Sequence, residues 1–393
     1  MKILFLHHNF PAQFGPIASL RASVGDDVVF ITEYNSGKKI DNVRSLVISQ
    51  KYSEDNSSLN GQISCGDRFH VAMLDLRNQD WFPDVIISHS GWGCGLWSKL
   101  VFPKAKLVSY SEWWFQYDFW HTNVLPADAF LKFDSCSDQK LYKRNLSISL
   151  ELAEADTIIT PTKWQRDQLP RQFSSRALVI HEGVDTNYYR PNHNWRPGNK
   201  FRVTYASRGF EPIRGFHYFI KALPLFLEQT NNTEVLIAGE DKICYGGQKP
   251  KSHPSWMAWA TELLEPHIKD RRVRFLGRLR NPYYARFLKS SHLHCYLTQP
   301  FVASWSLVEA MASGCNLLVS DNVPIREVVG VAGSYLNPVD SEAFSRSLIS
   351  HSIHRLAETA SYGGLARRRA IDCYNRAFSL EQWSNVLDSS LNS

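Results

Sequence analysis

The sequence contains little cysteine, and its cysteines follow no recognisable pattern. Seven Cys are scattered through 393 residues, and no two of them are spaced as Cys-x-x-Cys. An odd, unpaired set argues against a disulfide framework and against a structural zinc site, and it favours a reducing compartment. We therefore expect a cytoplasmic protein.

Long apolar runs are missing as well. No stretch approaches the roughly 18 apolar residues that a membrane-spanning helix requires. The first apolar stretch, Met1–Leu6, is interrupted at His7, and it is too short for the core of a signal peptide. Peripheral contact with the inner face of a membrane is the form of membrane association that stays open.

Neither sign of charge is in large excess. The 44 Lys and Arg residues outnumber the 38 Asp and Glu residues by six, which gives a net charge of +6. This excess is small and dispersed, and no nucleic-acid recognition motif accompanies it, so we expect no nucleic-acid partner. A mild positive excess suits a phosphorylated ligand or an anionic membrane surface.

Motifs for metal binding and for hydrolysis are also absent. His7 and His8 are adjacent, so their side chains cannot share one face of a strand. No Asp-x-Asp sequence is available for a metal-bound pyrophosphate. The sequence also lacks a Walker loop and a Ser-His-Asp order. We expect no metal, no other cofactor, and neither ATPase nor hydrolase chemistry.

The sequence does contain two series of short apolar strands separated by helix-length segments. The first series runs from Lys2–Leu6 to Thr157–Thr160, and the second runs from Arg202–Ala206 to Asn316–Ser320. Polar residues and prolines over 184–199 form the best candidate linker. Strands that alternate with helices predict an α/β protein made of two Rossmann-like, doubly wound parallel-sheet domains. We place these domains at residues 1–185 and 186–377, with a C-terminal helix over about 378–393 that packs back on the first.

The segment Pro300–Val329 carries the most chemical information. It predicts a loop, a helix that begins near Ser304–Ser306, and a strand over Asn316–Ser320. A helix N-terminus exposes unpaired N–H groups that suit a pyrophosphate, and Ser304 or Ser306 can cap the helix and donate to phosphate. Glu309 can accept hydrogen bonds from ribose hydroxyls, or it can merely oppose the dipole of a surface helix.

An aromatic run, Glu112–Trp120, follows the strand at Lys106–Tyr110. Trp113 and Trp114 in this run are candidates for a stacking platform that holds an acceptor. The run can equally be a core wedge over the sheet edge. Insertion into a membrane surface is a weaker alternative, because the run is not cleanly amphipathic.

Four stretches, in this order, resemble glycosyltransferase family 4, whose members have the GT-B fold. They are HEGVDTNYYRP (His181–Pro191), SRGFEPIRGFHYFIKALPLFL (Ser207–Leu227), VRFLGRL (Val273–Leu279) and SLVEAMASG (306–314). The resemblance covers essentially the whole chain. It implies two domains facing across a cleft, with the acceptor on the N-terminal side and a nucleotide-sugar donor bound mainly by the C-terminal domain.

The resemblance also implies roles for individual residues. Arg208 and Arg214 match the two basic residues that hold the donor diphosphate, and Glu309 matches the glutamate that binds the ribose. The other donor-binding positions that the resemblance implies are Gly15, Gly277, Arg278, Leu279, Phe301, Ser304, Trp305, Ser306 and Leu307.

Two positions depart from the family pattern. Phe301 stands where the family has a glutamate on the donor sugar. Glu112 stands where the family has a histidine, and His89 can supply an imidazole instead. We therefore expect catalytic roles for Arg208, Arg214 and Glu112, with His89, Trp113 and Trp114 on the acceptor side.

The activity that the resemblance implies is a metal-independent hexosyltransferase-type reaction (EC 2.4) with retention of anomeric configuration. The acceptor would be a hydroxyl of a glycan, a glycolipid or another glycoconjugate in a biosynthetic pathway such as polysaccharide assembly. Phe301 leaves a second reading open, a nucleotide-sugar-binding protein with weakened or lost activity. A nucleotide-sugar epimerase would need a cleft rich in carboxylates, and none is evident. Oligomeric state stays open.

Overall fold

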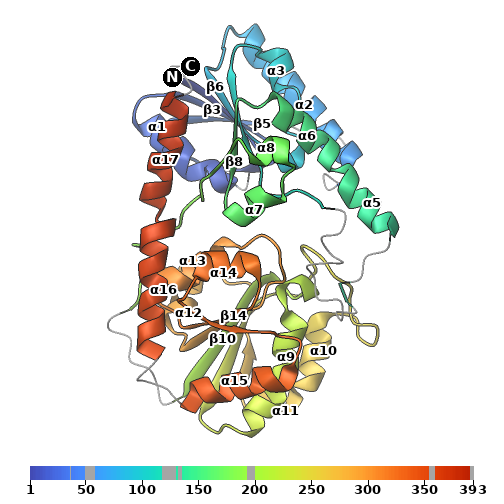
Figure 1. Ribbon diagram of the computed structural model, residues 1–393, viewed down its shortest axis with the longest axis vertical. Coiled ribbons are helices and arrows are strands. Elements are labelled where there is room, and N and C mark those ends of the chain that lie inside the picture. The colour runs from blue at the N-terminus through green and yellow to red at the C-terminus, as the bar shows by residue number, and fades with distance from the viewer. Residues whose placement is uncertain are drawn as a thin grey trace. The chain divides into compact units, whose positions relative to one another are not determined.

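The structure is a computed structural model that describes residues 1–35, 37–48, 58–116, 130–131, 135–192, 200–353 and 359–389. Its contacts divide the described chain into two compact units. The N-terminal unit contains the described parts of Met1–Phe119, Phe133–Gly183 and Arg376–Ser393, and the C-terminal unit contains those of Trp120–Lys132 and Val184–Asn375. Each unit is a parallel sheet with helices on both faces (Figure 1).

The N-terminal unit is built on a seven-stranded sheet in the order β5-β3-β1-β6-β7-β8-β9. Neighbouring strands in it pair in parallel. A separate parallel pair is formed by β2 and β4, which follow β1 and β3 along the chain. The strands of this unit are β1 (Lys2–Leu6), β2 (Asn9–Phe10), β3 (Asp27–Thr32), β4 (Tyr34–Asn35), β5 (Val43–Val47), β6 (Val85–His89), β7 (Lys106–Tyr110), β8 (Thr157–Thr160) and β9 (Ala177–Val179).

Two hydrophobic cores cover the two faces of this sheet, because successive strand residues point to opposite sides. Ile3 and Phe5 of β1 belong to one core, and Leu4 and Leu6 belong to the other. The helices of this unit are α1 (Gly15–Ser23), α2 (Leu59–Asn78), α3 (Ser98–Val101), α5 (Ser135–Lys143), α6 (Asn145–Glu154), α7 (Lys163–Gln168), α8 (Arg171–Ser174) and α17 (Arg376–Ser389), with 3-10 turns η1 (Ala12–Phe14) and η2 (Ser90–Trp92).

The C-terminal unit repeats this plan with six parallel strands in the order β12-β11-β10-β13-β14-β15. Val235 and Ile237 of β11 point into one core, and Leu236 and Ala238 point into the other. The strands are β10 (Phe201–Gly209), β11 (Thr233–Glu240), β12 (Val273–Phe275), β13 (Leu293–Tyr296), β14 (Leu317–Ser320) and β15 (Ser334–Leu336).

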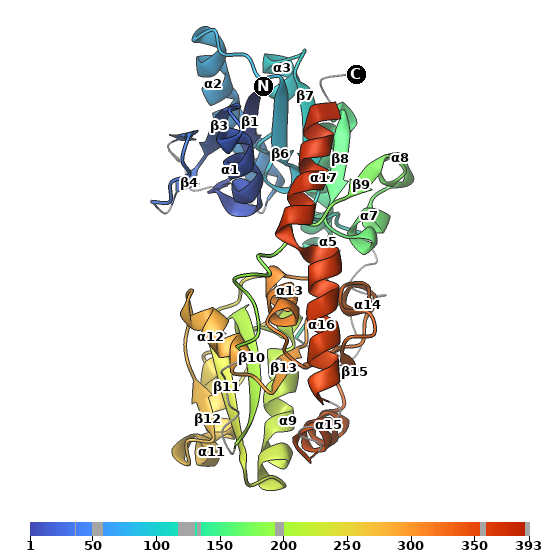
Figure 2. The ribbon, with the colours of Figure 1, turned by 90° about the vertical axis from the view of Figure 1, so that its left-hand side faces the viewer.

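Helices cover both faces of the second sheet. Helix α13 lies beside α16, as both views of the ribbon show (Figures 1 and 2). The helical segments of this unit are η3 (Pro212–Arg214), α9 (Phe216–Glu228), α10 (Trp256–Leu263), α11 (Glu265–Lys269), α12 (Tyr283–Lys289), α13 (Trp305–Ala312), α14 (Val323–Val329), α15 (Ser341–Ile353) and α16 (Thr359–Tyr374).

The strand order fixes where each unit can bind a ligand. In the N-terminal sheet the order reverses between β1 and β6, and in the C-terminal sheet it reverses between β10 and β13. In open α/β sheets, ligands commonly bind outside the carboxyl ends of the strands at such a reversal. The residues that follow β1, β6, β10 and β13 are therefore the first candidates for a site.

The chain ends with two helices that belong to different units. The expected break in the C-terminal helix lies at Asn375, slightly before the predicted 377–379, and separates α16 from α17. Helix α17 packs against α1 in the N-terminal unit (Figures 1 and 2). Its Trp383 ring lies 6.2 Å from the Phe14 ring, and the Arg21 guanidinium lies 2.9 Å from the Asp388 carboxylate.

Candidate functional site

Arg214 lies in the turn that follows β10, beside the reversal point of the C-terminal sheet. Pro212 begins η3, where the fixed φ of proline suits the start of a helix. Gly215 ends η3 with a φ of +68°, and a Cβ added there would lie 2.4 Å from the carbonyl oxygen of Leu297. Only glycine therefore lets this turn approach the segment after β13.

The Arg214 guanidinium is buried but forms no ion pair with a described residue. Its Nη1 atom donates to Thr298 Oγ1 at 3.1 Å and to the Tyr296 hydroxyl at 3.4 Å. Burial opposes the charge, but the Tyr296, Tyr245 and Glu211 side chains raise the pKa of Arg214 overall. The side chain is thus a buried cation with neutral hydrogen-bond acceptors, which is a suitable environment for an anionic ligand.

Arg208 reaches the same place from the end of β10. Its exposed side chain donates from Nη1 to the Tyr245 hydroxyl at 3.3 Å. The Tyr245 ring also lies under the Arg214 guanidinium carbon, 4.6 Å from it. The structure therefore brings the two predicted arginines together on one aromatic side chain.

The N-terminus of α13 lies next to this pair. Tyr296 links them, because its hydroxyl accepts from Arg214 and also from the backbone N–H of Ser304 at 3.0 Å. Ser304 occupies the N-cap position, but its side chain does not cap the helix, contrary to our expectation. It bonds to the Ser306 hydroxyl instead. Trp305 is exposed, and the Leu307 side chain is buried in the core, so Leu307 can offer a ligand only its backbone.

Glu309 lies one turn along α13 and faces two tyrosines. Burial raises the pKa of Tyr189, and a hydrogen bond and the charge of Glu309 raise it further. Burial and the Glu309 charge likewise raise the pKa of Tyr284. Asn281 donates to the Tyr189 hydroxyl at 3.0 Å. Glu309 is thus a partly buried carboxylate in a polar setting rather than a residue of an open surface helix.

Gly277, Arg278 and Leu279 follow β12. Gly277 has a φ of +65°, and an added Cβ would meet nothing within 4 Å, so its Cα side faces open space. The Arg278 guanidinium is more than half exposed and lies 3.7 Å from the Glu240 carboxylate. Leu279 packs against the core below α13. Gly277 therefore presents one open backbone face, while its carbonyl oxygen accepts from the Gly239 N–H at 3.0 Å.

Phe301 lies beside the arginines. Its ring centroid is 5.7 Å from the Arg214 guanidinium carbon and 5.8 Å from the Tyr245 ring. The departure from the family pattern thus places an apolar, partly exposed face beside the candidate anion site.

In the N-terminal unit, the ends of β1 and β6 bring His7 and His89 together. The ring centroids are 5.1 Å apart, and each Nδ1 accepts a backbone N–H, from Asn9 at 2.8 Å and from Gly91 at 3.1 Å. Each neutral ring therefore carries its proton on Nε2. Burial, together with the neighbouring His89 and His8, lowers the pKa of His7 well below its ordinary value.

Glu112 follows β7 and lies beside His89. The Glu112 Oε2 atom is 3.4 Å from His89 Nε2, and about a third of the Glu112 side chain is exposed. Gln165 donates to the Glu112 carbonyl oxygen at 2.6 Å and fixes the backbone there. The two residues that the sequence offers in place of the family histidine are thus adjacent.

The remaining predicted residues of this unit differ in accessibility. Gly15 begins α1 and is buried, and a Cβ there would lie 2.9 Å from Pro11 Cγ. Trp114 lies in the core, with its ring 6.1 Å from Phe173, so it offers no stacking surface. Trp113 is partly exposed and packs on Trp164 at 5.6 Å. The end of the aromatic run, residues 117–120, lies outside the described residues.

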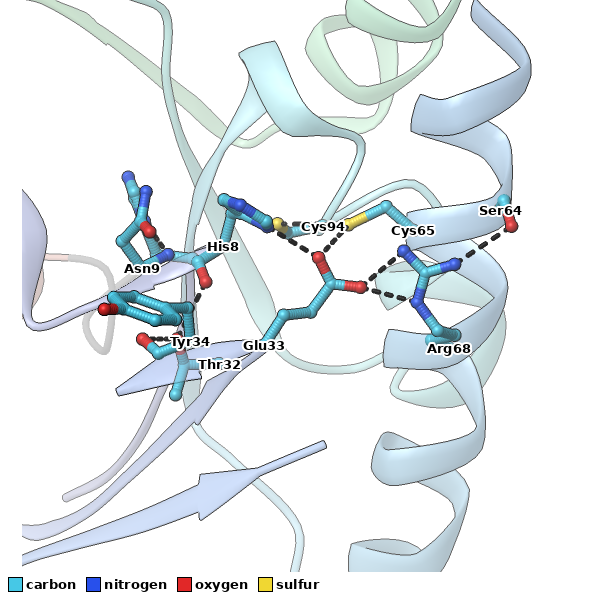
Figure 3. A network of polar contacts seen from close by, with 10 residues as sticks. His8, Asn9, Thr32, Glu33, Tyr34, Ser64, Cys65, Arg68 and Cys94 are labelled. Carbon is cyan, nitrogen blue, oxygen red and sulfur yellow. Dashed lines mark hydrogen bonds and ion pairs between the residues drawn. The ribbon is translucent and has the colours of Figure 1, made fainter. Parts of the chain in front are cut away.

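A second polar network in this unit centres on Glu33, just after β3 (Figure 3). The Glu33 carboxylate accepts from His8 Nδ1 at 2.6 Å and pairs with the Arg68 guanidinium. Burial raises its pKa, but the His8 and Arg68 bonds outweigh this and lower the pKa to about 2. The His8 ring stacks on Trp92 with centroids 5.3 Å apart. The side chains of His7 and His8 thus point to opposite sides of the chain, as their adjacent positions after β1 require.

Sequence reasoning missed several of these residues. Tyr245, Tyr296 and Thr298 surround Arg214, and Glu33 orients His8. Each follows or ends a strand, so position alone could have marked all four. Tyr245 also stands beside two glycines in a polar loop after β11, which is a pattern typical of ligand-binding turns.

Two features, a membrane-spanning helix and a cluster of metal-binding side chains, are absent from the described ranges. No helix within them has the length and apolar character that crossing a bilayer requires. Nor do three or more of their His, Cys, Asp or Glu side chains gather as they would around a metal ion.

Comparisons with known proteins give the same family for both units. Residues 24–189 match the model of the glycosyl transferase family 4 group, and residues 200–351 match that of glycosyl transferases group 1. A phosphatidyl-myo-inositol mannosyltransferase of Mycolicibacterium smegmatis is 26% identical over 198 residues, which are 48% of this chain and 45% of that protein. The Mycobacterium tuberculosis protein of the same name is 26% identical over 57% of this chain and 54% of its own length. This chain therefore aligns with about half the length of these relatives.

Solved structures resemble the chain over its full length. Sucrose-phosphate synthase from Thermosynechococcus elongatus superposes with a TM-score of 0.73 at 15% identity, covering 100% of this chain and 99% of that one. Anabaena HepE in complex with UDP and glucose superposes with a TM-score of 0.69 at 16% identity, covering 99% and 100%. With the strand orders of both sheets, these matches confirm the expected fold. The chain belongs to the glycosyl transferase family 4 and group 1 proteins and has the GT-B fold.

Proposed function

We propose that the chain transfers a sugar, with retention of anomeric configuration, from a nucleoside-diphosphate sugar to a hydroxyl acceptor. The observation that carries this proposal is the Arg214 guanidinium, which is buried among neutral acceptors beside the N-terminus of α13. A buried cation and the N-terminus of a helix together suit a diphosphate. Family membership supports the reaction type.

The donor would lie at the reversal point of the C-terminal sheet. Arg208 and Arg214 would hold the diphosphate. The backbone N–H groups of Trp305 and Ser306 would complete the anion site, since those of Ser304 and Leu307 donate to Tyr296 and to the Ser304 carbonyl oxygen. Both features stabilise charge that develops on the leaving diphosphate. Glu309 would accept from the ribose, and the turn at 277–279 would face the base. Because this site supplies positive charge itself, we propose that no metal ion is needed.

The acceptor would lie at the carboxyl edge of the N-terminal sheet. Glu112 and His89 are adjacent there, and the Nε2 proton of His89 is available to a carboxylate or a substrate oxygen. Gly15 would act only through its backbone, and Trp113 would offer its partly exposed aromatic face. The related mannosyltransferases are named for a phosphatidyl-myo-inositol acceptor. We infer by analogy a lipid-linked or glycan hydroxyl, reached by a cytoplasmic protein at a membrane face.

One observation favours a second candidate function. Phe301 places an apolar ring, instead of a carboxylate, beside the anion site. If the family glutamate is indispensable for orienting the sugar, the chain would bind a nucleotide sugar without transferring it.

A single-turnover experiment separates the two functions. The full chain is mixed with a radiolabelled nucleoside-diphosphate sugar, with and without soluble and lipid-linked sugar acceptors, and released nucleoside diphosphate is followed. Transfer predicts release that depends on an acceptor, and nuclear magnetic resonance of the product should show the donor's anomeric configuration. Tight binding without release by any acceptor supports the binding protein. An inverted product contradicts the proposed mechanism.

A further inference from the structure

Tyr245 contacts both arginines of the C-terminal unit. Its hydroxyl accepts from Arg208 Nη1 at 3.3 Å, and its ring centroid lies 4.6 Å from the Arg214 guanidinium carbon. The side chain is 44% exposed, so it lies at the surface of the candidate anion site rather than in the core. One side chain thus constrains two cations, of which one comes from the end of β10 and the other from η3.

Glu211 holds the loop that carries Tyr245. The Glu211 Oε2 atom accepts three successive backbone N–H groups, from Cys244 at 2.8 Å, Tyr245 at 2.7 Å and Gly246 at 3.2 Å. Consecutive N–H groups that converge in this way form a concave anion-binding turn. Glu211 is fully buried, so this carboxylate serves as an internal anchor and does not compete for the exposed face of the site.

Two glycines allow the same loop to lie close to the turn that contains Glu211. A Cβ at Gly209 would lie 2.3 Å from the Lys242 carbonyl oxygen. Gly247 has a φ of +102°, and a Cβ there would lie 2.6 Å from Pro212 Cγ. Residues 242–247 therefore lie in close contact with residues 209–212. The position of the Tyr245 backbone is fixed relative to the turn that carries Arg214.

We propose that Tyr245 is a positioning residue that aligns Arg208 and Arg214 on one diphosphate, with Glu211 as its anchor. This inference rests on the proposed function of the same site. An aromatic face stabilises a guanidinium without neutralising it, whereas a carboxylate partner would form an ion pair that the ligand must break. The hydroxyl bond restricts the rotamers of the exposed Arg208, which lowers the entropy that ligand binding costs.

Tyr245→Phe and Tyr245→Ala test the proposal in the full chain. Calorimetric titrations with UDP, GDP, ADP, dTDP and CDP, and with the matching nucleosides, measure affinity. Tyr245→Phe should lower the affinity for whichever diphosphate binds by roughly threefold to tenfold, which is the effect of losing one hydrogen bond. Tyr245→Ala should weaken it by at least roughly tenfold, because the ring contact is lost too. The nucleoside affinity should stay unchanged, since a nucleoside has no phosphate for the arginines.

A double-mutant cycle separates positioning from simple structural support. If the hydroxyl acts through Arg208, Tyr245→Phe should have no further effect in an Arg208→Ala background. A structural role would instead give additive losses. Tyr283→Phe and Tyr283→Ala are matched controls, because Tyr283 is 63% exposed and its ring lies 5.8 Å from the Arg286 guanidinium carbon on α12. These controls should leave the diphosphate affinity unchanged.

The outcomes distinguish this inference from the proposed function. A wild-type chain that binds a nucleoside diphosphate, together with Tyr245 variants of equal affinity, overturns the positioning role and leaves the function intact. Equal losses for diphosphate and nucleoside also overturn it, because they would mean that the loop as a whole has shifted. A wild-type chain that binds none of the five diphosphates overturns the proposed function and this inference with it.

Discussion

At the scale of single residues, the candidate donor site depends on the buried charge of Arg214, which the charge of Glu211 favours but with which no described carboxylate forms an ion pair. Thr298 and Tyr296 accept from this guanidinium, and both are neutral. A buried charge without an ion-pair partner is costly unless it is hydrogen-bonded or serves a ligand. Arg214 therefore reads as a residue whose partner is an external anion.

Replacing Arg214 should show how much of the diphosphate affinity depends on its positive charge and how much on its planar guanidinium. Arg214→Lys keeps a cation but loses the planar fork, so we expect diphosphate affinity to fall by about tenfold. Arg214→Met keeps an unbranched chain without charge, and the loss should reach about 100-fold, or roughly 3 kcal/mol. Isothermal titration of both variants checks this. Wild-type affinity in Arg214→Met would exclude the residue from the site.

We predict that Glu33 contributes to the free energy of unfolding in a pH-dependent way. Its folded pKa is about 2, below the unfolded value, so the carboxylate stabilises the fold above about pH 5 and loses this effect as the pH falls toward 2. The full contribution is about 3 kcal/mol, and about half of it should remain at pH 3. Urea unfolding of Glu33→Gln should therefore differ from wild type more at pH 7 than at pH 3. The control Asp75→Asn changes an exposed carboxylate on α2, the helix that carries Arg68, the partner of Glu33, and it should show no difference. A Glu33→Gln difference that is constant with pH would refute the prediction.

Sequence reasoning reached some of these residues and not others. It named Arg208 and Arg214, which stand in a motif whose spacing is visible in the sequence. It missed Tyr245, which lies more than 30 positions after Arg214 and contacts it only because β10 and β11 pair in parallel. It proposed Trp114 as a stacking surface, but the ring is buried, because the sequence does not show which side of the aromatic run faces the sheet.

At the scale of elements, α17 completes the core of the N-terminal unit. Trp383 is buried and contacts the Phe14 and Tyr110 rings, each at 6.2 Å. These two rings belong to η1 and β7. The last helix of the chain therefore covers part of the core face formed by its first residues.

Trp383→Ala should destabilise the N-terminal unit by about 3–5 kcal/mol, because it opens a cavity among aromatic rings. The C-terminal unit has its own cores, so nucleoside diphosphate binding at low temperature should persist. Calorimetric unfolding and a binding titration on the same sample check both statements. Phe378→Ala removes an exposed ring from the same helix and should change neither. A loss of nucleotide binding in Trp383→Ala would contradict the assignment of the donor site to the C-terminal unit.

The elements themselves were largely predictable. The central strands are apolar runs bounded by polar residues, so their positions could be read directly, and α13 begins at the predicted place. The short edge strands β9 and β15 were missed. Each has only three residues and none of them is buried, so the sequence shows no clear alternation of apolar and polar residues. The break between α16 and α17 came close to prediction, although it lies at Asn375.

At the scale of the whole molecule, the two similar units carry different kinds of polar side chains at their candidate sites. Each has a reversal of strand order, and each gathers polar side chains at that reversal. The C-terminal unit gathers cations, Arg208 and Arg214, while the N-terminal unit gathers imidazoles and a carboxylate, His7, His89 and Glu112. A diphosphate suits the first group, and a hydroxyl acceptor suits the second.

The most direct test of this account is a thermal-shift panel of UDP, GDP, ADP, dTDP and CDP sugars with the wild-type chain and Arg208→Ala. A ligand that binds only the folded state raises the melting temperature, and the stabilisation grows with the logarithm of the ligand concentration divided by Kd. The account predicts that sugars of one nucleotide stabilise the wild type and that Arg208→Ala loses most of the shift. Stabilisation by none of the five, or an equal shift in both proteins, would contradict a donor site at these arginines.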